Sequence, residues 1–177
     1  VTYYKSELWK LLPVFLLLLP LVLPETIINR FLSVGNMSDS STSYRVFIWL
    51  GTLLMLRDFW LGGIGLGEKT FRTIYPYYSY VGITAPHSHN LYLQLVVESG
   101  IAGLLMFAAV MVIFFKDCIN AGNRSRKAGA VSYALAAGVL GFLVQSMFDY
   151  TFYNYRVMGI FFMVLALGAA VKNIAGG

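Results

Sequence analysis

The sequence predicts an all-α membrane protein, with about four spanning helices and a long extracytoplasmic loop that carries short interfacial helices. The first observation is composition: of 177 residues, 58% are hydrophobic and only 12% are charged, and the mean hydropathy is +0.70. A soluble domain has about a quarter of its residues charged. The second observation is the arrangement of apolar stretches long enough to cross a bilayer. The single cysteine excludes an intrachain disulfide, and scattered basic residues do not indicate nucleic-acid binding.

The apolar stretches divide the chain into three parts. Residues 1–24 form the first spanning segment, residues 25–89 the extracytoplasmic loop, and residues 90–177 the remaining three spans. Within these parts the expected apolar helices cover residues 8–24, 90–115, 130–148 and 157–172. The chain begins with Val1 inside an apolar region, so we expect a fragment of a longer polytopic protein.

The loop 25–89 is the polar part of the chain. It holds nine charged residues and both histidines, and loops of this length are uncommon unless they are functional. A helix is expected over residues 44–59, because this stretch is apolar but too interrupted by charge to span. The glycines between residues 62 and 67 should end it, and the aromatic residues 75–80 are expected at headgroup depth.

The distribution of basic residues predicts the orientation. The segment 116–127 contains four basic residues and one acid, and short loops rich in lysine and arginine remain cytoplasmic. Alternation of the spans then places the loop 25–89 and the turn 149–156 outside. Both histidines therefore face the extracytoplasmic side.

The junction between the loop and the second span concentrates the candidate chemistry. His87 and His89, the only histidines of the chain, lie just before the apolar helix that starts near Asn90. A helix N-terminus favours anions such as phosphate, and an unprotonated histidine there can act as a general base. The alternative is that His89 only caps an interfacial helix. Glu98 lies on the opposite side of the helix from His89, which favours a packing role.

Three arginines share the outer loop with the histidines: Arg45, Arg57 and Arg72. Guanidinium groups bind phosphate oxygens in a forked geometry, although each arginine could instead be an interfacial residue and Arg57 could pair with Asp58. The sequence contains no clustered carboxylate pair and no phosphate-binding P-loop. We therefore expect neither a metal ion nor a cofactor.

Several motifs resemble those of the O-antigen ligase and polymerase superfamily. His89-Asn90, nine further residues, and Gly100-Ile-Ala-Gly103 match its His-Asn-x9-Gly-x-x-Gly signature. Weaker similarities lie at residues 45–49 (Arg-x-x-x-Trp), at residues 58–67, where Trp60 replaces the usual proline, and at residues 145–149, where Gln145 replaces a histidine.

The resemblance implies a GT-C-like membrane glycosyltransferase. Such enzymes transfer a glycan from an undecaprenyl-diphosphate carrier to an acceptor hydroxyl, on the outer face of the bacterial inner membrane. They are metal-independent and inverting. The implied partners are the lipid-linked glycan donor, a glycan, lipid or protein acceptor, and membrane lipid. The catalytic residues would be His89 and Arg45. The expected substrate-binding residues are Asn90, Arg57, Arg72, Tyr75 and Asp149.

Three alternatives remain open at the level of the sequence. Within the family, a ligase and a polymerase are not distinguished. A transporter or flippase of lipid-linked glycans, without covalent chemistry, is the second function class, because Glu98 lies inside an apolar helix. A membrane scaffold with interfacial histidines is the third.

Overall fold

The computed structural model describes residues 40–124 and 126–176, and all regular structure within them is helical. The first predicted span and the start of the loop lie outside the described residues. Three α-helices are long: α5 (Leu91–Arg124), α6 (Arg126–Gln145) and α7 (Tyr155–Gly176). The other elements are α3 (Ser40–Phe59), α4 (Glu68–Ile74) and the 3-10 turns η2 (Tyr75–Tyr77), η3 (Tyr80–Gly82) and η4 (Thr151–Tyr153).

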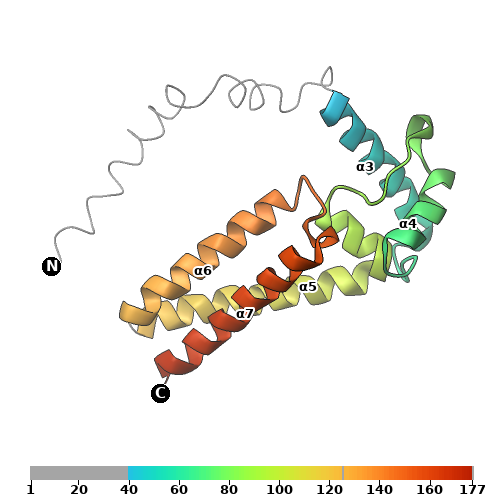
Figure 1. Cartoon of the computed structure of the whole chain (residues 1–177). Helices are drawn as coiled ribbons and strands as arrows, with labels where there is room; N and C mark the ends of the chain where they lie inside the picture. The colour runs from blue at the N-terminus through green and yellow to red at the C-terminus, as the bar shows by residue number, and fades with distance from the viewer. Residues whose placement is uncertain (1–39, 125, 177) are drawn as a thin grey trace, which may run out of the picture. The chain divides into compact units, whose positions relative to one another are not determined.

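The long helices α5, α6 and α7 lie side by side and form a bundle (Figure 1). Each of the three is long and apolar enough to cross a membrane, which confirms the all-α membrane fold. The predicted loop over residues 116–127 is wrong, because α5 continues to Arg124 and α6 begins at Arg126. This stretch contains no proline, so no residue in it blocks the helical hydrogen bonds.

Apolar side chains fill the interior of the bundle. They come from all three helices and from η4: Leu91, Met111, Phe114, Cys118, Val139, Phe152 and Phe161. Large apolar side chains also point outward along the same helices, among them Met106 and Met163. An outward apolar surface on helices of this length is what a lipid environment requires.

The helix α5 is broken near its N-terminal end, at Gly100. This residue has φ 69° and ψ −177°, a combination that is essentially restricted to glycine. The backbone groups freed by the break bind the glycine-rich segment after α3, which we call the glycine loop (residues 60–67). Ile64 N–H donates to the Val97 carbonyl at 2.7 Å, and Ile101 N–H donates to the Trp60 carbonyl at 2.7 Å.

Close approach of two backbones explains why glycines are needed here. A Cβ at Gly100 would lie 2.0 Å from the Leu61 carbonyl oxygen, and one at Gly63 would lie 2.4 Å from the Glu98 carbonyl oxygen. The backbone of the glycine loop and the backbone of α5 therefore meet without intervening side chains. This contact fixes the glycine loop against the N-terminal part of α5.

A second apolar core lies beneath α3, α4 and η2. Its buried members are Ile48, Met55, Phe71, Tyr75, Ala85 and Val97. The helix expected over residues 44–59 is present as α3 and starts four residues earlier than predicted. Because Val97 belongs to α5, this core packs the loop helices against the first turns of that helix.

Candidate active site

His89 stands at the start of α5 with an unusual backbone. Among the non-glycine residues that the structure describes, it is the only one with a positive φ, at 50°. Its carbonyl accepts a hydrogen bond from Trp49 Nε1 at 3.4 Å, and the ring of Tyr44 approaches its imidazole edge-on. Both contacts come from α3. The histidine is therefore held in place by residues forty or more positions away in the sequence.

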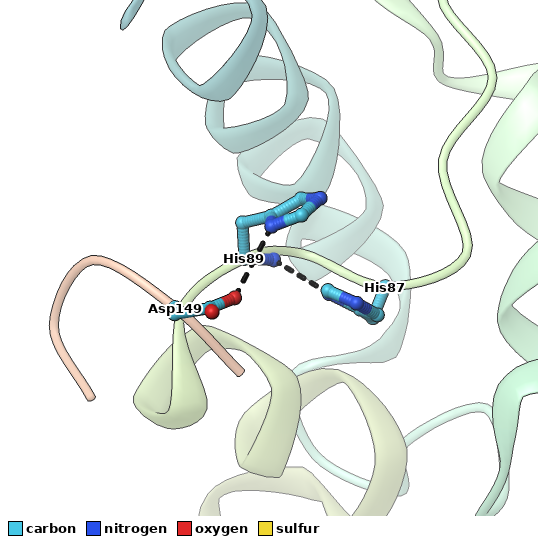
Figure 2. Close-up of side chains that lie close together, drawn as sticks. All are labelled: His87, His89 and Asp149. Carbon is cyan, nitrogen blue, oxygen red and sulfur yellow. Dashed lines mark hydrogen bonds and ion pairs between the residues drawn. The ribbon is translucent and has the colours of Figure 1, made fainter. Parts of the chain in front are cut away.

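Asp149 is the carboxylate partner of His89. Its Oδ1 lies 3.3 Å from Nδ1 of His89 and also accepts the Tyr150 N–H at 2.8 Å. Figure 2 shows the two side chains converging from the start of α5 and from the turn after α6. Because Nδ1 faces the carboxylate, Nε2 is the atom left to exchange a proton with a substrate. The structure places Asp149 beside His89, and its predicted role in substrate binding stays a prediction.

His87 is the residue that the sequence left without a role. Its Nδ1 accepts the backbone N–H of His89 at 3.2 Å (Figure 2), and the two rings are 4.2 Å apart between centroids. Burial, together with the nearby His89, lowers the pKa of His87 to about 4. The ring is therefore neutral at neutral pH, and its Nδ1 is a hydrogen-bond acceptor.

Asn90 caps α5. Its Oδ1 accepts the Leu93 N–H at 2.9 Å, three residues into the helix, as an N-cap does. Its Nδ2 donates to the Met147 carbonyl at 2.7 Å, and the next residue, Leu91, donates its N–H to the Ser146 carbonyl at 2.9 Å. Nδ2 of Asn90 and the Leu91 N–H thus tie the start of α5 to the residues that follow α6, whereas Oδ1 of Asn90 caps α5 itself. Substrate binding by this side chain stays a prediction.

The three arginines are placed differently from one another. Arg72 lies on α4 and forms an ion pair with Glu68, whose other carboxylate oxygen accepts the Tyr153 O–H at 3.0 Å. The Tyr153 ring packs 4.6 Å from that of His87, so Arg72 is linked to the site through two intermediate residues, Glu68 and Tyr153. Arg57 is exposed in the last turn of α3.

Arg45 is partly exposed and follows Tyr44, which touches His89. In the described part of the chain, no hydrogen bond or ion pair joins Arg45 to the histidines.

Asp58 does not pair with Arg57; it accepts the Tyr78 O–H at 2.6 Å.

Tyr75 requires a correction. The sequence predicts Tyr75 on an aromatic surface that contacts sugars or lipid headgroups. In the structure Tyr75 is fully buried and stacks on Phe71 in the second core. A side chain with no exposed surface lacks the access that substrate binding needs. The aromatic surface of this segment consists instead of Tyr77 and Tyr80, both exposed. The prediction failed because the segment 75–80 contains four tyrosines, and their order in the sequence does not show which one points inward.

His87, His89 and Asp149 together form a candidate ligand set for a metal ion. Each provides one ligand atom, and these atoms lie within 4.8 Å of one another. Imidazole and carboxylate ligands suit several divalent metals. The sequence did not indicate this group, because Asp149 is sixty residues from His89. In the structure, His87 Nδ1 and His89 Nδ1 already have protein partners.

The fold and the site together define a polytopic helical membrane protein with a histidine–aspartate pair at the end of a spanning helix. A family model described as O-antigen ligase matches residues 1–108, which is more than half of the chain. The chain therefore belongs to this family, and membership indicates surface polysaccharide biosynthesis of the ligase or polymerase kind.

The matched region includes His89, Gly100 and Gly103 and ends before Asp149. No curated protein and no solved structure matches the chain.

Proposed function

We propose that the protein transfers a glycan from a polyprenyl-diphosphate carrier, of the undecaprenyl type, to an acceptor hydroxyl. The observation that carries this proposal is the His89–Asp149 pair, in which Nδ1 faces a carboxylate and Nε2 is available. A sugar hydroxyl is a weak nucleophile that needs a base, and an imidazole oriented by a carboxylate is suited to that task.

The proposed step is a single displacement at the anomeric carbon. The acceptor oxygen forms a bond to this carbon while the bond to the diphosphate oxygen breaks, and the hydroxyl proton goes to Nε2 of His89. One displacement inverts the configuration of the carbon. The lipid diphosphate leaves with its electron pair, and nearby cations stabilise its charge. Arg45 and Arg72 are the candidates for this role, with Arg57 farther along α3.

The proposed location is the bacterial inner membrane, with the site on the outer face. The basic residues Lys116, Arg124, Arg126 and Lys127 lie around the junction of α5 and α6, at the opposite end of α5 from His89. From Ile101 to Arg124 the helix rises about 36 Å, enough to cross a hydrocarbon core of about 30 Å. The positive-inside rule then assigns the basic end to the cytoplasm.

Transfer activity with site variants tests the proposal. The full-length protein in detergent is given a polyprenyl-diphosphate-linked oligosaccharide and a glycan acceptor, and the product is followed by mass spectrometry. His89→Ala should lower the rate by about 100-fold or more. Asp149→Asn should lower it by at least about tenfold, because the imidazole loses its orienting partner. Asp58→Asn, which alters an exposed aspartate bound to Tyr78, is the matched control and should stay near the wild-type rate.

The same assay decides between the remaining alternatives. Full transfer by His89→Ala at normal protein levels contradicts the proposal. A flippase or transporter would give no covalent product in detergent at all. The break in α5 gives little support to transport, because the Val97 carbonyl and the Ile101 N–H freed by it bind the glycine loop. Activity should also survive EDTA. Loss of activity that added metal restores would instead indicate an ion held by the two histidines and Asp149.

A further inference from the structure

A buried row of hydrogen bonds runs along α5 before its break at Gly100. The Ser88 N–H donates to Oε1 of Gln94 at 2.7 Å, and Nε2 of Gln94 donates to Oε1 of Glu98 at 3.0 Å. The same Glu98 oxygen accepts the Gly67 N–H at 3.2 Å. Ser88 and Gln94 are fully buried, and Glu98 is 6% exposed. We call this row the Gln94–Glu98 relay.

Burial of these groups would be costly if they only filled space. A carboxylate and an amide removed from water must find hydrogen-bonding partners, and an apolar pair would pack here without that requirement. The relay instead uses both ends of the Gln94 amide and a doubly accepting oxygen of Glu98. Burial raises the pKa of Tyr150, and Glu98 adds to this increase, so the relay also borders the turn that follows Asp149.

One end of the relay holds the residue before His89. The Ser88 N–H is taken by Gln94, while Oγ of Ser88 donates to the Asn90 carbonyl at 2.8 Å. The backbone is therefore fixed on both sides of His89, the residue with the left-handed φ. A left-handed conformation is unfavourable for a residue with a side chain. It persists only where the surroundings enforce it, and Gln94 supplies one of the enforcing contacts.

The other end of the relay holds α4. Gly67 is the residue before the first turn of this helix, and the next residue, Glu68, binds Arg72 and Tyr153. Tyr153 packs on His87. The relay thus connects the two structures that flank the histidines: the loop that bears His89 and the helix that bears Arg72.

We propose that Gln94 and Glu98 are positioning residues. They hold His89 in its reactive orientation and fix the position of α4 relative to His89. This inference rests on the proposed transferase function. Neither residue touches the reacting atoms. Their loss should therefore lower kcat while leaving the KM for the donor within about twofold, because misplacement of a catalytic group by a fraction of an ångström slows the chemical step.

Exchanging the two polar side chains provides the test. In Gln94→Glu, two buried carboxylates face each other at positions 94 and 98, and kcat should fall about tenfold or more. Glu98→Gln keeps an oxygen for Gly67 and for Gln94, and should stay within about threefold of wild type. In the double variant Gln94→Glu/Glu98→Gln, the new carboxylate accepts from Ser88 and from the new amide, so kcat should recover to within about threefold. Melting temperature and monodispersity in detergent are measured for each variant.

The outcomes separate the inference from the proposed function. Wild-type kcat in Gln94→Glu, or failure of the double variant to recover, overturns the relay as a positioning device. If Gln94→Glu does not accumulate, Gln94→Met removes the amide at similar volume, and full kcat in that variant is equally contradictory. His89→Ala is assayed in parallel. An inactive His89→Ala with a fully active Gln94→Glu refutes only the relay, whereas an active His89→Ala refutes the proposed function.

Discussion

The two parts of α5 on either side of Gly100 are stabilised in different ways. Before the break, from Leu91 to Ser99, buried positions include Gln94 and Glu98, and both are hydrogen-bonded. After the break, the buried positions of α5 are Met111, Phe114, Cys118 and Ala121, which pack against α6 and α7. The part of α5 before the break, which we call the outer region, adds directional polar contacts to the apolar packing of Leu91 and Val97. The part after the break, the inner region, is specified by the filling of volume.

One helix thus contains a region that fixes the direction of side chains and a region that contributes most of the packing free energy. Hydrogen bonds fix a side chain in direction but contribute little net free energy each. Apolar packing contributes more per side chain but tolerates small shifts. The outer region therefore suits a site that must hold His89 and Asp149 at a fixed geometry. The inner region suits an anchor in lipid.

The largest expected effect comes from substituting Gly100, the residue at which the two regions of α5 meet. Gly100→Ala places a side chain on a backbone with φ 69° and 2.0 Å from the Leu61 carbonyl oxygen. We expect a loss of more than about 5 kcal/mol of stability together with loss of transfer. Gly138→Ala is the matched control in α6, because nothing lies within 4 Å of its added Cβ and alanine favours helix by about 1 kcal/mol. Thermal unfolding in detergent measures both. A stable, active Gly100→Ala would mean that the glycine loop is not docked as described.

A smaller effect is expected from the apolar core that packs against the inner region of α5, and it should appear in stability alone. Phe161 is 4% exposed and contacts Phe107, Phe142 and Phe152. Phe161→Ala should destabilise the bundle by roughly 3 to 5 kcal/mol, while the kcat of the folded fraction stays near wild type. Met163→Ala, at a 67% exposed position, should change unfolding little. A large fall in kcat for folded Phe161→Ala would show that the two regions are not separable.

The smallest effect is a pH dependence confined to the outer region. The pKa of His87 falls from 6.5 to about 4 on folding, so the unfolded chain binds more protons between these values and stability falls as the pH drops from about 6.5 to 4. The loss attributable to His87 should be about 3 kcal/mol by pH 4.

His87→Asn keeps an acceptor for the His89 N–H but does not titrate, so its melting temperature should fall less over this pH range. Equal slopes for wild type and variant would assign the pH dependence to other groups.

Local patterns were sufficient to predict the three long apolar helices, and they singled out His89 as the candidate catalytic residue. The apolar length of each span is a property of consecutive residues, and so is the spacing from His89 to Gly100. The pairing of His89 with Asp149 joins residues sixty positions apart, and no local pattern encodes it. The docking of the glycine loop was also missed, because it is made by backbone atoms that every sequence possesses. Tyr75 and Tyr77 have the same side chain, and only the packing of α4 decides which of them is buried.

The docking of the glycine loop has a consequence for how such a protein diversifies. Because backbone atoms and glycines make the contact with α5, the side chains of Leu61 and Leu66 remain outside it and are 66% and 77% exposed. Substitutions at these two positions leave the attachment unchanged. Evolution can therefore alter the surface that this loop presents without altering the geometry at His89.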